Sequence, residues 1–142
     1  MIEFKNVTKR YPGGKVALDN LNLKIDDGEF VFIMGDSGAG KTTMTKLLLR
    51  EERITGGEQQ RVALARAIIN NPHTIIADEP TGNLDPKLSM EIMGLLVKMK
   101  EYNKTVVVVT HEAELAKMFN QRIVRLRDGR VVEDTAAGGE SR

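Results

Sequence analysis

Gly35-Asp36-Ser37-Gly38-Ala39-Gly40-Lys41-Thr42 fits the pattern G-x-x-x-x-G-K-[ST]. The residues before it, Phe30–Met34, are apolar and β-prone, and those after it as far as Arg53 favour a helix. In a strand–loop–helix unit, glycines let backbone N–H groups surround an anion, and the helix N-terminus adds the positive end of its dipole. The pattern therefore predicts a phosphate-binding loop in preference to an ordinary glycine-rich turn. Lys41 would reach the β- and γ-phosphates of a nucleotide, and the Thr42 hydroxyl would hold Mg²⁺.

Composition limits the classes of function. A chain of 142 residues with 41% hydrophobic residues is long enough for one aliphatic core. Twenty-one basic against 20 acidic residues give a net charge of +1, which does not favour nucleic acid as a partner. The sequence contains no cysteine, no signal-peptide pattern at Met1–Lys5 and no apolar run of about 20 residues. We therefore expect a cytoplasmic protein that could reach a membrane only through a partner.

Hydrophobic patterning predicts one α/β domain over residues 1–142 in which strands and helices alternate. We expect a β-rich part at 1–28, a phosphate-loop unit at 29–53, a third part at 54–135 and a polar tail at 136–142. Strands are predicted near 30–34, 74–78, 105–110 and 122–126, followed by a hairpin at 127–133. Helices are predicted over 41–53, from near Glu58, over 86–100 and over 112–119. The helix over 86–100 is expected to bury Ile92, Leu95, Leu96 and Met99.

Two further stretches carry polar groups that could act on a nucleotide. Asp78 and Glu79 end an apolar strand, where one carboxylate could hold Mg²⁺ and the other could deprotonate a water. The alternative is that Asp78 and Glu79 are simply solvated carboxylates at the end of a strand, without a role in chemistry. His111 ends another apolar strand at the same level, although a histidine there is more often structural. Thr55-Gly56-Gly57-Glu58 is a capping box, and on local chemistry alone a helix cap is favoured over an anion site.

Taken together, these motifs resemble the ATP-binding-cassette (ABC) ATPase family. Thr55–Gln60 is similar to its signature motif, Ile75–Pro80 to its Walker B strand and Asn83-Leu84-Asp85 to its D-loop. The resemblance implies a P-loop NTPase core of the ABC/RecA-like kind, with a mostly parallel sheet flanked by helices and antiparallel strands at the N-terminus. Tyr11 matches the aromatic residue that stacks on adenine, whereas its spacing alone favours simple packing.

The resemblance also implies roles for individual residues. Glu79 would be the general base, His111 would contact the γ-phosphate or the attacking water, and Lys41 would complete the catalytic set. Mg²⁺ would be held by Thr42 and Asp78. The signature residues Thr55, Gly56, Gly57 and Glu58 would act in trans within a homodimer of the intact family, and Asp85 would belong to the D-loop. ATP or ADP would be bound by Tyr11, Gly35, Asp36, Ser37, Gly38, Ala39, Gly40, Lys41, Thr42 and Thr43.

One departure from the family is large. Thr42 and Thr55 are only 13 positions apart, and no glutamine lies between Thr42 and Gln59. The family's Q-loop and the helical subdomain that docks on a transmembrane subunit are therefore expected to be missing. The join falls near Glu52–Thr55. Natural loss, engineered shortening and recombination could each produce it, and we favour engineered shortening because both flanks keep family sequence. The loss would leave the parallel core intact but would expose a new sheet edge.

Within the family, Lys9–Pro12, Leu47–Glu52 and Ala77–Asp85 resemble the cell-division branch, with the lipoprotein-export and macrolide-export branches as near alternatives. Three functions stay open at this point: slow Mg²⁺-dependent ATP hydrolysis, ATP binding with little turnover, and a scaffold without affinity for nucleotide. Because the docking segment is missing, we do not expect this chain to couple to a transmembrane subunit.

Overall fold

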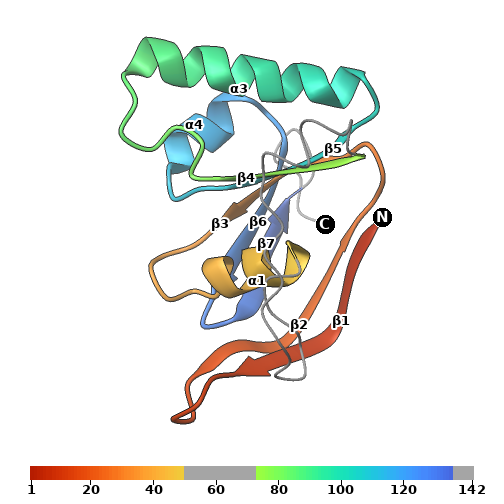
Figure 1. Ribbon diagram of the computed structural model, residues 1–142, viewed down its shortest axis with the longest axis vertical. Helices are drawn as coiled ribbons and strands as arrows, with labels where there is room; N and C mark the ends of the chain where they lie inside the picture. Colours follow the sequence, from red (N-terminus) through yellow and green to blue (C-terminus); the bar gives the residue numbers. More distant parts are fainter. Residues whose placement is uncertain (50–72, 136–142) are drawn as a thin grey trace.

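The computed structural model describes residues 1–49 and 73–135, which form two sheets and their flanking helices (Figure 1). The predicted helix near Glu58 and the polar tail lie outside the described residues. A two-stranded antiparallel sheet contains β1 (Ile2–Arg10) and β2 (Val16–Ile25). The remaining elements are β3 (Phe30–Met34), α1 (Lys41–Leu48), β4 (Thr74–Asp78), α3 (Pro86–Glu101), β5 (Thr105–Val109), α4 (Ala113–Met118), β6 (Arg122–Arg127) and β7 (Arg130–Thr135).

The second sheet has the order β4-β5-β3-β6-β7 and confirms the expected parallel core. β3 pairs in parallel with β5, with Phe30 opposite Val106, and with β6, with Val31 opposite Arg122. β4 pairs in parallel with β5, and β7 returns antiparallel to β6. Every residue of β3 and β5 is buried, as is typical of central parallel strands that are covered on both faces. Among the described strands, β4 lies at one end of this sheet.

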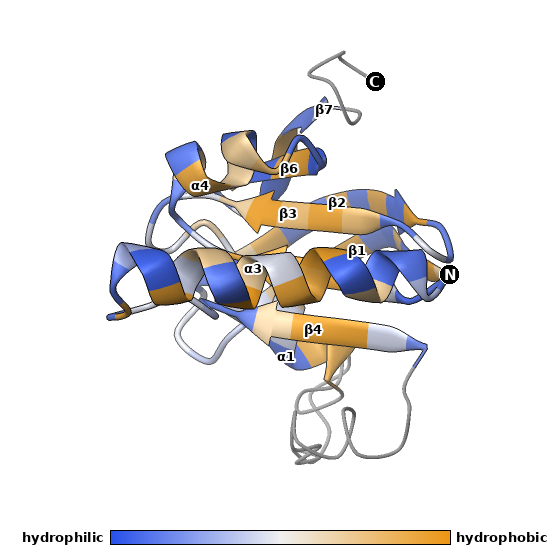
Figure 2. Cartoon of the chain, turned by 90° about the horizontal axis from the view of Figure 1, so that it is seen from above, coloured by the Kyte–Doolittle hydropathy of each residue, from blue (hydrophilic) through white to orange (hydrophobic). Residues whose placement is uncertain are grey.

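Alternate residues of β3 supply the two faces of the core, because successive side chains of a strand point in opposite directions. Val31 and Ile33 belong to a cluster that includes Met44 of α1 and the apolar residues of β1 and β2. Phe30 and Phe32 belong to the opposite cluster, which includes residues of α3 and α4. The sheet is therefore sandwiched between α3 and α4 on one face and α1 with the β1–β2 hairpin on the other (Figures 1 and 2).

Helix α3 packs through a face that is partly different from the predicted one. Met93 is fully buried, and Leu96 and Met99 pack against the same cluster as expected. Leu95 is 58% exposed, so its predicted burial is wrong. Two helical positions separate it from Met93, which turns it by roughly 200° about the helix axis. The predicted buried face, made of Ile92, Leu95, Leu96 and Met99, did not include Met93, which the structure buries fully.

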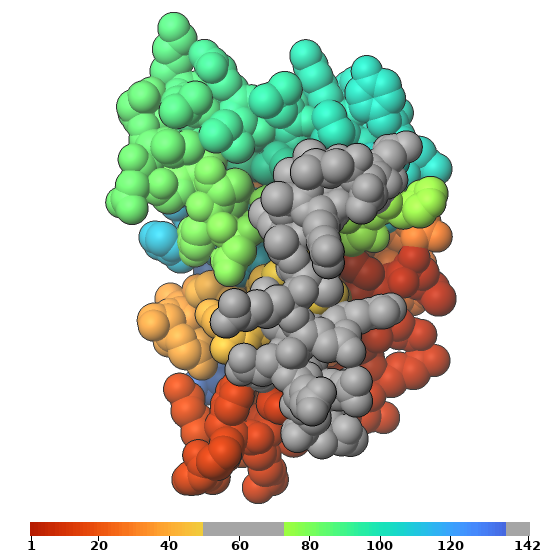
Figure 3. All heavy atoms as spheres, in the orientation of Figure 1, coloured from red at the N-terminus to blue at the C-terminus, as the bar shows by residue number. Residues whose placement is uncertain are grey.

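The ends of the molecule along its long axis are formed by α3 and by the β1–β2 hairpin (Figure 3). Within the described part of the chain, no helix combines the length and apolar character needed to span a bilayer.

Candidate functional site

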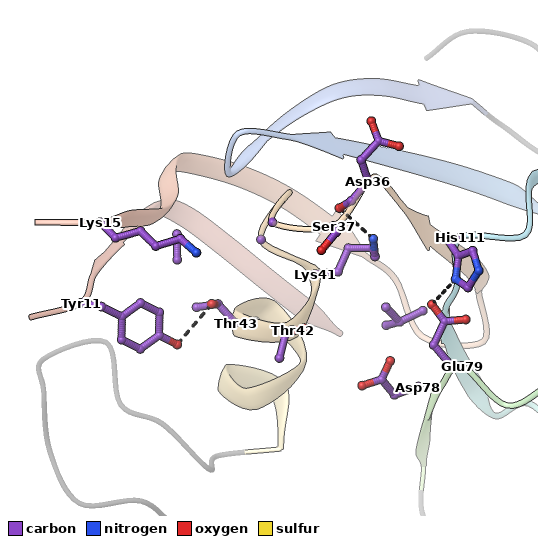
Figure 4. Close-up of a pocket in the computed structure, with 14 residues that line it drawn as sticks. Tyr11, Lys15, Asp36, Ser37, Lys41, Thr42, Thr43, Asp78, Glu79 and His111 are labelled. Atoms are coloured by element: carbon purple, nitrogen blue, oxygen red, sulfur yellow. Dashed lines mark hydrogen bonds and ion pairs between the residues drawn. The ribbon is translucent and has the colours of Figure 1, made fainter. Parts of the chain in front are cut away.

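A cleft of about 860 Å³ lies at the carboxyl ends of β3, β4 and β5. Tyr11 and Lys15 lie at one end of it and Glu79 and His111 at the other, with the glycine loop between them (Figure 4). The cleft is lined by Tyr11, Lys15, Ala17, Asp36, Ser37, Gly38, Gly40, Lys41, Thr42, Thr43, Asp78, Glu79, Val109 and His111. The fold thus brings together polar residues from four separate stretches of the sequence.

The glycine loop joins β3 to α1 and leaves the start of the helix open. Gly38 and Gly40 have φ angles of 82° and 102°, which belong to the left-handed region where glycine is favoured. Gly40 is the N-cap of α1, and no side chain accepts a hydrogen bond at that cap. The first N–H groups of a helix have no partner within the helix. This end of α1 can therefore offer N–H donors and a positive dipole to an anion in the cleft.

Lys41 is anchored to the loop that it follows. Its ammonium donates hydrogen bonds to the backbone carbonyls of Gly35 and of Asp36, the latter at 3.0 Å. These contacts hold the ammonium group beside the glycine loop. Lys41 is also one of the residues that line the cleft. The arrangement places one fixed cation beside the N-terminus of α1, so both favour an anion at the same place.

The two carboxylates at the end of β4 have different surroundings. Glu79 accepts a hydrogen bond from Thr110 Oγ1 to Oε2 at 3.3 Å, and His111 Nδ1 lies 2.9 Å from its Oε1. Its backbone has a φ of 47°, which non-glycine residues seldom adopt, and its N–H donates to the carbonyl of Val109 at 2.7 Å. In Figure 4 the carboxylate of Asp78 lies on the side of Thr42, whereas that of Glu79 lies beside His111. The two carboxylates are thus suited to two different tasks.

Two side chains in the cleft, those of Asp78 and His111, have raised pKa values. Partial burial raises the pKa of Asp78, the charge of Glu79 raises it further, and Lys41 opposes both effects. The hydrogen bond with Glu79, and then the negative charge of Glu79, raise the pKa of His111. Asp78 therefore lies where negative charge is poorly compensated, a situation that a bound cation would relieve.

The donor set suits Mg²⁺ that is bound together with phosphates. Thr42 and Asp78 both line the cleft and offer a hydroxyl and a carboxylate oxygen. Among the described residues, no three His, Cys, Asp or Glu side chains gather in a way that could hold a metal. Mg²⁺ commonly uses one or two carboxylates, waters and substrate phosphates, and seldom a cage built by the protein alone. Thr42 and Asp78 therefore fit an ion that arrives with a nucleotide.

Tyr11 lies at the far end of the cleft from the carboxylates. Its hydroxyl is 3.2 Å from Thr43 Oγ1, and the ammonium of Lys9 lies 5.4 Å from the centre of its ring. The ring is partly buried and lines the cleft, so packing and ligand contact are compatible at this position. Stacking of an adenine on Tyr11 stays a prediction.

The structure brings most of the predicted site residues into this one cleft. Gly35 and Ala39 belong to the loop but are not among the residues that line the cleft. Asp85 is instead the N-cap of α3, where its carboxylate accepts a hydrogen bond from the N–H of Leu88 at 2.9 Å. The signature residues Thr55, Gly56, Gly57 and Glu58 lie outside the described residues. Three lining residues were not predicted, namely Lys15, Ala17 and Val109.

Sequence reasoning could have found Lys15. It immediately follows the turn at Tyr11–Gly14, and a residue four positions from the aromatic that is predicted to contact the ligand is a candidate for the same site. Ala17 and Val109 carry no polar side-chain group, so only the fold reveals them.

Comparisons with known proteins agree with this architecture. The family model described as "ABC transporter" matches residues 18–55 and 50–82. The chain is 30% identical to the cell division ATP-binding protein FtsE of Bacillus subtilis, with 97% of both chains covered. This alignment runs over 222 positions, more than the 142 residues of the chain, so tens of positions of the relative have no counterpart here.

Two further matches are informative. The macrolide export ATP-binding/permease protein MacB of Chlorobaculum tepidum is 32% identical over 94% of this chain and 34% of its own length. Among solved structures, the ATP-binding cassette MJ0796 of Methanocaldococcus jannaschii, a dimer in a post-hydrolysis state with ADP and Pi, matches with a TM-score of 0.76. It is 30% identical to this chain, and the match covers 96% of this chain and 99% of that one.

Proposed function

The chain belongs to the ABC transporter family of ATP-binding proteins, and on this basis we propose that it binds ATP together with Mg²⁺ and hydrolyses it slowly. One observation carries the proposal: the anchored Lys41, the open N-terminus of α1, and both Asp78 and Glu79 line a single cleft. Phosphate-binding groups and a carboxylate pair are the parts that phosphoryl transfer to water requires.

In this proposal, residues at different places along the cleft have different roles. The loop amides and Lys41 bind the phosphates, while Tyr11 faces the base. Thr42 and Asp78 hold Mg²⁺, which neutralises the phosphate charge when it is bound. Glu79 deprotonates the attacking water, because its carboxylate is oriented by Thr110 and His111 and because Asp78 is the carboxylate assigned to the metal.

A melting experiment tests the binding. At a nucleotide concentration 100 times Kd, ligand binding stabilises the folded state by about 2.7 kcal/mol. For a domain of this size such a gain corresponds to a rise in Tm of roughly 6–10 °C. Lys41→Ala should lose most of this rise, whereas Lys5→Ala, which removes an exposed lysine on β1, should keep it. No rise in the parent protein with millimolar Mg·ATP would refute the proposed binding.

A phosphate-release assay tests the chemistry. Glu79→Gln keeps the size of the side chain and one of its two acceptor oxygens but cannot take up the proton of a water molecule. We expect it to abolish turnover and to keep the ATP-dependent rise in Tm. Equal phosphate release by the parent and by Glu79→Gln would exclude Glu79 as the base.

A second candidate is ATP binding with little turnover. The observation that favours it is the lack of any glutamine between Thr42 and Gln59, where the family carries its Q-loop. Positioning errors of about 1 Å can reduce a rate roughly 100-fold. Binding without phosphate release would identify this alternative, and the lack of both would leave only a scaffold.

The biological setting is part of the same proposal. The FtsE relatives support a cell-division origin, and the MacB relative supports an export system as the alternative. The full-length parent would dock on a transmembrane subunit at the cytoplasmic face of the plasma membrane, whereas this chain would act in the cytoplasm without that subunit. A homodimer is part of this proposal, and the dimeric structure of the MJ0796 cassette with ADP and Pi supports it.

A further inference from the structure

The turn between β6 and β7 touches the glycine loop directly. The N–H of Gly129 donates a hydrogen bond to the carbonyl of Ala39 at 3.0 Å, and its own carbonyl accepts one from the N–H of Asp19 at 3.0 Å. Gly129 is buried. A residue near the end of the described chain therefore links the phosphate-binding loop to β2.

Only glycine fits at this position, for two separate reasons. Asp128 and Gly129 have φ angles of 50° and 75°, the backbone of a two-residue hairpin turn that favours Asp-Gly. A Cβ on Gly129 would also lie 2.6 Å from the carbonyl oxygen of Ala17 and 2.7 Å from the Cα of Leu18. Both atoms belong to the backbone of β2, so neither could move aside as the end of a flexible side chain could.

The start of the glycine loop packs closely against the same hairpin. A Cβ on Gly35 would lie 2.5 Å from the carbonyl oxygen of Leu126, the penultimate residue of β6. Arg130 adds a side-chain tie, because its guanidinium donates to one carboxylate oxygen of Asp19 at 2.5 and 2.9 Å. The loop from Gly35 to Gly40 is thus backed at both ends by the β6–β7 hairpin.

The hydrogen bond to Ala39 has a consequence for the opposite side of the loop. In a planar trans peptide the C=O and N–H groups point in opposite directions, and the described residues contain no cis peptide bond. Since the Ala39 carbonyl is directed at Gly129, the N–H of Gly40 in the same peptide is directed away from the hairpin. Gly40 lines the cleft, so this N–H is available to an anion there.

We propose that Gly129 is a positioning residue of the nucleotide site, which orients the Gly40 amide toward the phosphates through its hydrogen bond with Ala39. The proposal rests on the proposed binding of ATP, but the orientation itself can be observed without a nucleotide. Its site of action is the backbone of the loop, and Gly129 itself does not touch the ligand.

The test compares Gly129→Ala with a matched control. Gly28 has a nearly equal φ of 78°, and a Cβ there would lie 2.9 Å from the flexible side chain of Asn103. Gly28 precedes β3 and is thus at the opposite end of that strand from the loop. Both substitutions introduce backbone strain, but only the first disturbs the loop. We expect Gly129→Ala to weaken Mg·ATP binding by at least ten-fold in calorimetry, and Gly28→Ala to lower Tm without changing Kd.

A nucleotide-free readout separates this proposal from the proposed function. The amide resonance of Gly40 should shift in Gly129→Ala and stay in place in Gly28→Ala, whether or not the parent binds ATP. If Gly129→Ala does not fold, Arg130→Gln takes its place, with an expected two- to five-fold weaker Kd and a shifted Gly40 resonance. A parental Kd and an unshifted Gly40 amide in the folded variant would overturn the proposal, as would equal effects in the Gly28 control.

Discussion

Lys15→Ala probes the cleft directly, because Lys15 is one of the residues that line it. It also tests a residue that was not among the predicted site residues. Among the residues that line the cleft, the lysines are Lys15 and Lys41, and none is an arginine. Figure 4 shows Lys15 between Tyr11 and the glycine loop. For a nucleotide whose base stacks on Tyr11 as predicted and whose phosphates extend toward Asp78, the sugar and first phosphate would lie beside Lys15. Loss of Lys15 should therefore weaken the attraction for the phosphates and leave the rest of the site in place.

The expected size follows from Coulomb's law. For one phosphate charge at about 5 Å and an effective dielectric constant of about 60 in an open cleft, the interaction is worth about 1 kcal/mol. That energy corresponds to a roughly five-fold higher Kd for ATP at low salt. Because the charges are accessible to water, the difference should shrink as the ionic strength rises.

The assay is equilibrium binding of ATP, ADP and adenosine to the parent, to Lys15→Ala and to Lys5→Ala. The control removes the same charge from β1, where the Lys5 side chain is 74% exposed and pairs with Glu3. We expect a loss for ATP and ADP but none for adenosine, and no loss in the control. An unchanged affinity for ATP in Lys15→Ala, or an equal loss for adenosine, would refute the phosphate contact.

Two further predictions concern packing and charge. Met93→Ala should lower the free energy of unfolding in urea by about 3 kcal/mol because it opens a cavity, whereas Leu95→Ala should change it by less than about 0.5 kcal/mol; similar losses would mean that α3 packs through another face. His111 has its pKa raised in the folded protein, so the stability from its pair with Glu79 is fully present below the usual value of 6.5 and is lost as the pH rises through the folded pKa. In NMR titrations Glu79→Gln should lower the pKa of His111, and an identical titration in both proteins would contradict the pairing.

Local sequence patterns predicted the strands well because strands in a buried parallel sheet are continuous apolar runs. The run Phe30–Met34 is β3 and the run Thr74–Asp78 is β4, with the predicted bounds. The position of β5 between β4 and β3 depends on pairing between segments that are distant in the sequence, so no single segment encodes it. The phosphate loop was predictable for the opposite reason, because its chemistry lies in eight consecutive residues.

What sequence patterns missed depends on contacts between distant residues. The burial of Met93 in place of Leu95 is decided by how α3 is rotated on the sheet, and hydrophobicity alone does not specify that rotation. The support of Ala39 by Gly129 joins residues of two hairpins, and Asp-Gly in a turn is explained locally by its φ angles. The left-handed backbone of Glu79 is likewise unusual for glutamate, and only the structure reveals it.

The pairing of β3 determines when the site can form during synthesis. Phe30 pairs with Val106, Val31 pairs with Arg122, and Ala39 receives its hydrogen bond from Gly129, so each partner is translated long after the strand and loop it supports. The β1–β2 hairpin pairs locally and can form early. Because ribosomes add about 5–20 residues per second, the residues that pair with β3 and contact the glycine loop are synthesised several seconds after the loop itself. Nucleotide affinity should therefore arise in one late step, when the chain beyond residue 130 leaves the ribosome, and not gradually as the nascent chain lengthens.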